Sequence, residues 1–276
     1  MKTLSIIGAG RVGQTLARVW HQQAVFRIGQ VMNRSLASTA HALTVIGAGT
    51  AASWPDMQPA DIWMLSVADD QISQTVTQLV AGAVLRPGDV VFHCSGAKAS
   101  LLLAPAAQAG ACTASLHPVR SFADPVQVAA DFAGTICSLE GDVQALTLLE
   151  TALQAVAAHT VRIEAEHKLV YHAAAVMASN YLVTLMDTVL ATYQAAGIPL
   201  EMAQAMAAPL ARLSLENVFS LGAERALTGP IARGDMVLVE QQAAALKQAL
   251  PEAGALYQAL IAPTQALAAR RIHSEK

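Results

Sequence analysis

The chain has 276 residues, of which 54% are hydrophobic and 13% are charged, and its formal net charge is −3. This length favours two domains over one. The absence of a basic block excludes the electrostatic footprint of a nucleic-acid-binding protein. The three cysteines (Cys94, Cys112 and Cys137) lie far apart without a CxxC pair, which predicts reduced thiols in a cytoplasmic protein and neither disulfides nor a metal site. The short N-terminal apolar stretch is broken by Arg11, and the other apolar stretches contain polar residues, so we expect no signal peptide and no membrane span.

Residues 1–164 alternate short β-type segments with helical ones. Typical helical segments are "GQTLARVWHQQA" and "DQISQTVTQLVAGA". The expected strands are "TLSIIGAG", "FRIGQVMN", "DIWMLSV", "DVVFHCSG", "CTASLHP" and "GTICSLEG". Such alternation predicts an α/β fold, a Rossmann-type parallel sheet covered by helices on both faces.

Residues 165–276 form a second predicted domain, because no convincing strand follows residue 164 and the sequence is typical of consecutive helices. We expect breaks between helices at 196–199, 227–230, 233–235 and near Pro251. Because this half is rich in alanine and poor in charge, we expect it to bury its helices against a second copy, as a homodimer.

A glycine fingerprint lies in the segment "IIGAGRVG", where a β-type run leads directly into a helix. Gly8 permits a tight turn, Gly10 lets a pyrophosphate approach the backbone, and Gly13 allows the helix to pack closely on the strand. The segment therefore predicts a dinucleotide site that includes Arg11 and Val12. A second match at Gly47-x-Gly49 is interpreted as a loop, because Pro55 would break a helix starting there.

The end of the second predicted strand indicates which dinucleotide binds. Rossmann domains that bind NAD usually carry an acid about twenty residues beyond the glycines, at the ribose 2′-hydroxyl. Here the sequence has Asn33, Arg34 and Ser35 instead. A guanidinium and a hydroxyl attract a 2′-phosphate, so the sequence predicts NADP(H).

The first predicted helix of the second domain carries polar side chains in an otherwise apolar stretch. With α-helical spacing, Lys168, His172 and Ser179 fall on one stripe, flanked by Tyr171 and Asn180. A polar stripe on such a helix indicates a cleft, where Lys168 would act as general acid or base.

Several motifs, in this order, resemble a bacterial family of NADP-dependent oxidoreductases that joins a Rossmann-like domain to a helical domain of unknown function. The motifs are "IIGAGRVG", "NRS", "LSVADDQI", "HCSGA", "LHPVRSF", "YHAAAVMASNYL" and "LTGPIARGD". The chain is more distantly similar to 6-phosphogluconate and β-hydroxyacid dehydrogenases, pyrroline-5-carboxylate reductase and prephenate dehydrogenase. The resemblance implies an oxidoreductase with this two-domain plan.

The resemblance also implies roles for single residues. Lys168 matches the catalytic lysine of β-hydroxyacid dehydrogenases, and His172 stands where those enzymes have an asparagine. His117, followed by Pro118, is the counterpart of a substrate-contacting His-Pro pair in prephenate dehydrogenases. With Asn180, these residues form the expected catalytic set.

The ends of two other strands complete the expected cofactor site. Ser66 and Val67 could line the nicotinamide ribose, and Ser95 with Gly96 could contact ligand. Asp69 or Asp70 after the first pair is interpreted mainly as a helix N-cap.

Two further polar residues leave alternatives open. His93 could be a core histidine with satisfied hydrogen bonds, in which case Ser95 and Gly96 at the end of the same strand are the ligand contact. Arg233 could hold an anionic substrate or a partner carboxylate.

Together these features predict an NADP(H)-dependent oxidoreductase that acts on a small carbonyl, imine or hydroxy-acid substrate in a cleft between the domains. The alternative is a non-catalytic NADP(H)-binding sensor or interaction module, which would tolerate loss of Lys168 and His172.

Overall fold

The computed structural model describes residues 1–274, with side chains to residue 271. It divides into two compact units, Met1–Met177 and Ala178–Lys276. The sequence prediction placed the division near residue 164. The segment between the two positions includes helix α7 (Lys168–Val176), which packs as part of the first unit.

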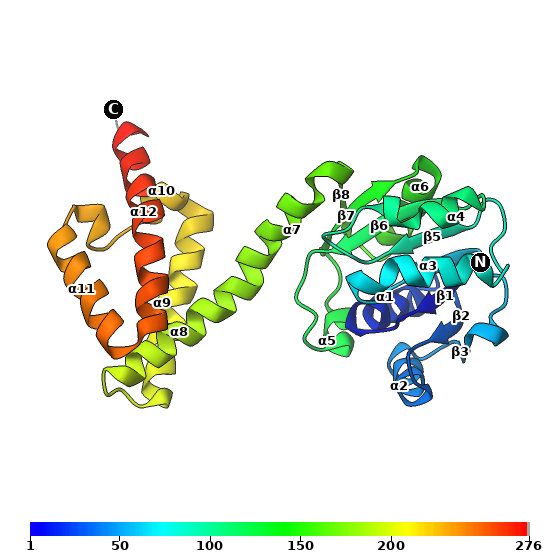
Figure 1. Ribbon diagram of the computed structural model, residues 1–276, viewed down its shortest axis with the longest axis horizontal. Helices are drawn as coiled ribbons and strands as arrows, with labels where there is room; N and C mark the ends of the chain where they lie inside the picture. The colour runs from blue at the N-terminus through cyan, green and yellow to red at the C-terminus, as the bar shows by residue number, and fades with distance from the viewer. Residues whose placement is uncertain (275–276) are drawn as a thin grey trace. The chain divides into compact units, whose positions relative to one another are not determined.

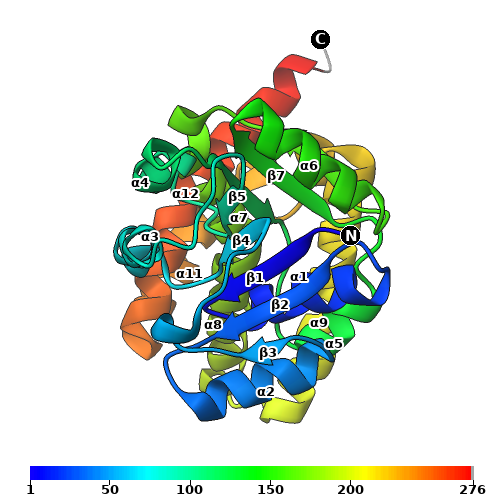
Figure 2. The same cartoon turned by 90° about the vertical axis from the view of Figure 1, so that its right-hand side faces the viewer.

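The first unit is built on an eight-stranded sheet with the order β3-β2-β1-β4-β5-β6-β7-β8 (Figures 1 and 2). The strands are β1 (Thr3–Ile7), β2 (Arg27–Met32), β3 (Thr50–Ala51), β4 (Ile62–Leu65), β5 (Val90–His93), β6 (Cys112–Pro118), β7 (Ile136–Gly141) and β8 (His159–Arg162). The order reverses between β1 and β4, as in doubly wound sheets that bind dinucleotides at that point. The predicted α/β Rossmann-type fold is confirmed.

Apolar residues explain why these segments form central strands. All four residues of β4 and all four of β5 are buried, which fits a sheet covered on both faces. The covering helices are α1 (Arg11–Gln22), α2 (Leu36–Ile46), α3 (Ile72–Ala81), α4 (Ala104–Gln108), α5 (Pro125–Ala130) and α6 (Val143–Gln154). Residues of α1, α2, α5 and α6 share one hydrophobic core and those of α3 and α4 share the other, so the two groups lie on opposite faces.

Two details of the sheet differ from the sequence prediction. Strand β7 pairs antiparallel with β6. A parallel pair would need a crossover that returns the chain to the opposite end of the sheet, and the connection here contains only the six-residue helix α5. The stretch around Gly49 was predicted to be a loop, but its last residues form the short edge strand β3 beside β2.

The second unit is all helical (Figure 1). Its helices are α8 (Leu182–Ala195), α9 (Leu200–Leu221), α10 (Ala223–Ala226), α11 (Met236–Ala249) and α12 (Pro251–Ser274), with a 3-10 turn, η6, at Ile231–Arg233. Helices end or begin at each of the four predicted breaks. An additional break at Gly222, whose φ is 84°, separates α9 from α10.

A π-helical turn, η5 (Met177–Tyr181), joins α7 to α8. A π turn closes hydrogen bonds between residues five apart, so it rotates the following residues relative to an α-helix. The predicted stripe assumed uniform α-helical spacing. The turn interrupts it before Ser179 and Asn180, both of which are exposed.

The helical run Ala165–Ala195 is the one stretch of the described residues that is long and apolar enough to cross a membrane. This finding rests on length and composition only, and core helices of soluble proteins pass the same test. A single run of this kind is therefore weak evidence for a span. In this run the Lys168 side chain packs against the sheet.

Candidate functional site

The glycine fingerprint forms a tight turn between β1 and α1. Gly8 has a φ of 82°, and a Cβ there would lie 2.4 Å from Cγ1 of Val67. A Cβ on Gly13 would lie 3.0 Å from the Ser66 side chain. At Gly10 the nearest atom to such a Cβ is 4.0 Å away, so the backbone before α1 stays open to a ligand. Gly8 and Gly13 therefore allow close packing, and Gly10 leaves space for phosphates at the helix N-terminus.

A cavity of about 1010 Å³ opens at the carboxyl ends of β1, β2 and β4. It brings together most of the cofactor residues predicted from the sequence, namely Gly8, Gly10, Asn33, Arg34, Ser35, Ser66 and Val67. Arg11, Val12 and Gly13 are not among its lining residues, and neither are Ser95 and Gly96. The sequence prediction missed Ser38 and His41, which line the cavity from α2. They lie three residues apart on the helix that begins just after Arg34, so helical spacing could have indicated them.

Around Arg34 the chain is arranged for an anion. The Arg34 side chain is exposed, and none of the hydrogen bonds or ion pairs found between described residues involves it. Asn33 donates its amide to the carbonyl of Ser38 at 3.0 Å. Ser35 is the N-cap of α2, with its hydroxyl accepting from the backbone N–H of Ser38 at 3.2 Å. In this state the Ser35 hydroxyl therefore caps a helix, and the guanidinium is the free cation.

A second polar cluster lies where β5 and β6 end and α7 packs on the sheet. Gly96 stands at its centre, since a Cβ there would lie 2.4 Å from Nδ1 of His172 and 2.8 Å from Nε2 of His117. The two imidazole rings are 5.4 Å apart and nearly perpendicular. Only glycine lets the backbone pass so close to both rings.

His117 also contacts Tyr171. Its Nδ1 lies 2.9 Å from the Tyr171 hydroxyl, and the two rings meet edge to face with centroids 5.8 Å apart. Burial, followed by the nearby His172 and Lys168, lowers the pKa of His117 to about 4, so the imidazole is neutral near pH 7. Burial raises the pKa of Tyr171, so its phenol keeps its proton.

Lys168 lies beneath this cluster and is only 1% exposed. Its Nζ donates to Oγ of Ser115 at 2.7 Å and to the Ser95 carbonyl at 3.3 Å. Glu140, also buried, places Oε1 4.0 Å from Nζ. Burial lowers the pKa of Lys168, and the carboxylate of Glu140 acts in the opposite direction. The lysine, predicted to face a cleft, instead ties α7 to Ser95, just after β5, and to Ser115 within β6.

Three neighbouring residues, His93, Asp69 and Asp70, also have defined environments. His93 is fully buried, with Nδ1 accepting from the Ser95 N–H at 3.2 Å and Nε2 3.1 Å from the Ala99 carbonyl, so it is a satisfied core histidine. The N-cap interpretation of Asp69 and Asp70 is wrong, because both lie in a 3-10 turn before α3 and neither makes a capping hydrogen bond. The chain enters α3 through that turn, which shifts the helix start to Ile72.

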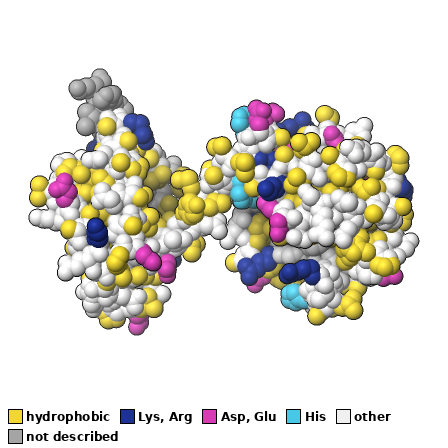
Figure 3. Space-filling model, in the orientation of Figure 1, with side chains coloured by type: hydrophobic (Ala, Val, Ile, Leu, Met, Phe, Trp, Pro, Cys, Tyr) yellow, Lys and Arg dark blue, Asp and Glu magenta, His cyan; other side chains and the backbone are white. Residues whose placement is uncertain are grey.

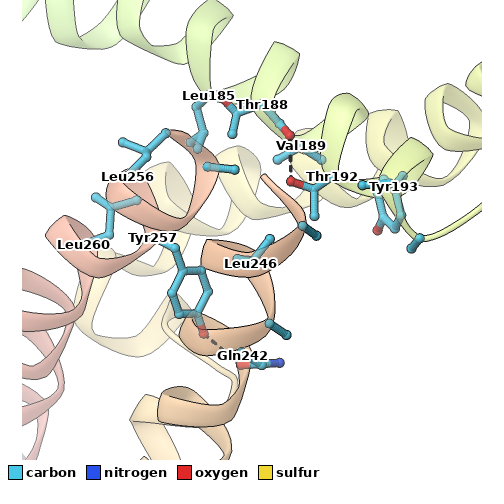
Figure 4. Close-up of a pocket in the computed structure, with 15 residues that line it drawn as sticks. Leu185, Thr188, Val189, Thr192, Tyr193, Gln242, Leu246, Leu256, Tyr257 and Leu260 are labelled. Atoms are coloured by element: carbon cyan, nitrogen blue, oxygen red, sulfur yellow. Dashed lines mark hydrogen bonds between the residues drawn. The ribbon is translucent and has the colours of Figure 1, made fainter. Parts of the chain in front are cut away.

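Other predicted site residues lie in the helical unit. Asn180 and Arg233 are exposed there, in η5 and η6. That unit has its own apolar cavity of about 560 Å³ between α8, α11 and α12 (Figure 4). Its polar groups are few, with Tyr257 donating to Gln242 at 2.7 Å.

The described residues contain no group of three or more His, Cys, Asp or Glu side chains placed to hold a metal ion. All three cysteines are free. Burial raises the pKa of Cys94 and of Cys137 to about 12, so both thiols are unreactive near neutral pH.

Comparison with known families follows the division of the chain. A Rossmann-like domain model matches residues 2–118, and a model named "Domain of unknown function (DUF2520)" matches residues 135–264. The two matches lie in succession along the chain, the Rossmann-like model first and the DUF2520 model second. No curated protein matches this chain.

Many solved structures share the fold of this protein. A proposed NADP oxidoreductase from Bacteroides fragilis is 19% identical with a TM-score of 0.80, over 96% of this chain and 98% of the other. A protein from Thermotoga maritima is 24% identical with a TM-score of 0.72, over 97% and 98%. An imine reductase from Myxococcus stipitatus, solved with NADP⁺, is 21% identical with a TM-score of 0.65, over 98% and 99%. At these identities the likeness establishes the fold.

Proposed function

We propose that this protein is an NADP(H)-dependent oxidoreductase that transfers a hydride to or from a small carbonyl, imine or hydroxy-acid substrate. One observation carries the proposal. The cavity at the switch point of the sheet joins an open glycine turn to a free guanidinium, Arg34, and has no acid at the end of β2. An acid there would repel a 2′-phosphate, and a free guanidinium attracts it.

The solved structures with the same fold support the reaction class. They include imine reductases in complex with NADP⁺ and NAD⁺ and a pyrroline carboxylate reductase with NADP bound. In each of them a fold of this kind holds a nicotinamide cofactor, which supplies or accepts a hydride.

Two groups of residues would bind the cofactor and the substrate separately. The glycine turn and Arg34 would bind the phosphates of the cofactor. The cluster around Gly96, with His117, Tyr171 and His172, would meet the substrate and handle its proton. A neutral imidazole and a protonated phenol near pH 7 can both donate and accept hydrogen bonds, which suits a carbonyl, an imine or an alcohol.

Calorimetry with NADPH and NADH tests the cofactor. We expect NADPH to bind roughly ten- to a hundredfold more tightly, the range of a charge-assisted hydrogen bond to the 2′-phosphate. Oxidation of NADPH in the presence of a panel of small imines, aldehydes and keto acids then tests the reaction. Tight NADPH binding with no turnover on any compound would favour the non-catalytic sensor instead, and equal affinity for both nucleotides would contradict the NADP(H) assignment.

A homodimer in the cytoplasm is part of the same proposal. In the helical unit the buried positions, through residue 271, are Ala203, Ala207, Val239, Ala253 and Gly254. No large side chain is among them, whereas Phe219 is 86% exposed. Apolar side chains are spread over this unit in Figure 3, with few charges between them. A second copy of the chain is the partner that would bury this surface.

A further inference from the structure

Lys168 is enclosed too completely to meet a substrate in this structure. Its Nζ is held by Ser115, the Ser95 carbonyl and the nearby Glu140, and its side chain is 1% exposed. A proton donor must come within hydrogen-bond reach of the substrate atom that it protonates. The groups of the cluster that keep partial exposure are His117, Tyr171 and His172.

Tyr171 is the one of these three that carries a hydroxyl, and His117 is a defined partner of that hydroxyl. The oxygen lies 2.9 Å from Nδ1 of His117, and Nε2 of His117 makes no hydrogen bond to the described residues. An imidazole that carries its proton on Nδ1 donates to the phenol oxygen. The phenol proton then points away from His117, towards the Ser138 hydroxyl or a ligand.

We propose that Tyr171, held by His117, donates the proton to the reduced substrate, and that Lys168 is a positioning residue beneath it. The inference rests on the proposed function, since it assigns the proton that must accompany the hydride. Lys168 holds Ser95, just after β5, and Ser115 within β6, and so supports the adjoining Gly96 and His117.

The step balances without a further reactant. As the C=N or C=O carbon of the substrate accepts the hydride, its π electrons move to nitrogen or oxygen, and that atom takes the proton from the Tyr171 hydroxyl. The phenolate left behind accepts a hydrogen bond from Nδ1–H of His117 and regains its proton from water. In the oxidative direction the phenolate removes the proton from the alcohol or amine.

The charged and titratable groups around the phenol come from three elements. His117 faces it from β6, Cys137 and the hydroxyl of Ser138 act on it from β7, and His172 shares its helix. Lys168 on the same helix, and Asp69 after β4, act on the His117 imidazole in opposite directions. His117 makes the 2.9 Å contact with the phenol oxygen, so a change at His117 should shift the ionisation of Tyr171.

Fluorine NMR of the full chain labelled with 3-fluorotyrosine tests this coupling without a substrate. The chain has four tyrosines, and Tyr171→Phe identifies one resonance by its loss. We expect this phenol to ionise above the ordinary pH range of a tyrosine, because burial raises its pKa. In His117→Leu its midpoint should rise by about one unit or more, since the phenolate loses its N–H donor. The surface variant His21→Leu should leave it unchanged, and an unmoved midpoint in His117→Leu would overturn the assignment.

Turnover with NADPH and a small cyclic imine, 2-methyl-1-pyrroline, or a small aldehyde tests the proton transfer itself. Tyr171→Phe should lower kcat by roughly 10²- to 10⁴-fold and leave the Kd for NADPH within about twofold. Tyr193→Phe, in the helical unit, is the matched control and should keep full activity. Normal kcat in folded Tyr171→Phe would contradict the proposal.

The role of Lys168 needs a variant that does not leave a buried charge alone. Lys168→Met leaves the buried Glu140 carboxylate without its cation, so it should unfold or inactivate the protein whatever the role of Lys168. The double variant Lys168→Met/Glu140→Gln removes both charges together. A positioning role predicts that it folds and regains turnover to within about tenfold of wild type, since a proton carrier is worth more than that. If the folded double variant is as inactive as Tyr171→Phe, Lys168 is the proton donor and the proposal fails.

These outcomes distinguish the proposed NADP(H)-dependent function from the proposed role of Tyr171. Failure of NADPH to bind wild-type protein would remove the proposed function, whatever Tyr171 does. Tight NADPH binding, combined with a Tyr171 resonance indifferent to His117, would leave the proposed function intact and remove only this inference.

Discussion

At the end of β2, Arg34 is an exposed guanidinium beside the cavity that the glycine turn opens. We predict that Arg34→Ala raises the Kd for NADPH roughly ten- to a hundredfold, because it removes a charge-assisted contact to the 2′-phosphate. The Kd for NADH, which lacks that phosphate, should hardly change. Calorimetry with both nucleotides measures the difference.

Arg27 at the opposite end of the same strand gives the matched control. It donates to the Thr3 hydroxyl at 2.6 Å and is not among the residues that line the cavity. Arg27→Ala should leave the affinities for both nucleotides unchanged. An Arg34→Ala protein that keeps the wild-type preference for NADPH would show that another residue selects the cofactor.

At the scale of elements, the approach of α7 to the end of β5 depends on Gly96. We predict that Gly96→Ala lowers kcat at least about tenfold while NADPH still binds, because the new methyl group would displace His117 and His172. Gly82→Ala, where the added Cβ meets its nearest atom at an ordinary 3.4 Å, is the control. Steady-state kinetics with the small-molecule panel, together with calorimetry, measures both effects. Wild-type kcat in Gly96→Ala would show that the two imidazoles do not have to stay where they are.

Which elements the sequence predicts, and which it does not, follows from the range of the interactions involved. Six of the eight strands of the Rossmann unit and the four expected breaks of the helical unit were predictable, because apolar runs, glycines and prolines act locally. The antiparallel pairing of β7 was not predictable, since it depends on how the chain returns to the sheet after β6. The π turn at Met177–Tyr181 also has no local signature, and it ended the stripe expected from uniform helical spacing.

The candidate site shows the same limit. The sequence indicated the glycine turn and Arg34, because cofactor binding requires those residue types in a fixed order. It also singled out Lys168, but not its burial, which depends on Ser95, Ser115 and Glu140 meeting it from distant strands. The partnership of His117 with Tyr171, 54 residues apart, likewise arises only from the tertiary fold.

At the scale of the whole molecule, burial of histidines makes stability depend on pH. Burial lowers the pKa of fully buried His93 from 6.5 to about 4, with a similar effect at His117. Between those two pH values the unfolded chain binds more protons than the folded one, so acid weakens the fold. We predict that the free energy of unfolding in urea falls as pH drops from 7 towards 4, with His93 contributing at most roughly 3 kcal/mol.

His93→Gln is the variant that isolates this contribution. A glutamine amide can donate to the Ala99 carbonyl and does not titrate in this range. The variant should lose less stability than wild type between pH 7 and pH 4, whatever its stability at pH 7. An identical pH dependence in the two proteins would contradict the assignment to His93.

The exposed apolar surface of the helical unit predicts a dimer. Phe219 on α9 is 86% exposed, and Leu210 on the same helix is 62% exposed. We expect light scattering at micromolar concentration to report a dimer, and Phe219→Asp to shift it towards monomer. Leu101→Asp, at a 79% exposed leucine of the Rossmann unit, should stay dimeric. A wild-type monomer at this concentration would rule the dimer out.

A crystal structure of the protein with NADPH tests the central claim most directly. We predict that the pyrophosphate lies at the glycine turn beside Gly10, the 2′-phosphate contacts Arg34, and the nicotinamide ring points towards Gly96 and Tyr171. Density for NADPH elsewhere, or a bound cofactor whose 2′-phosphate does not contact Arg34, would contradict the account.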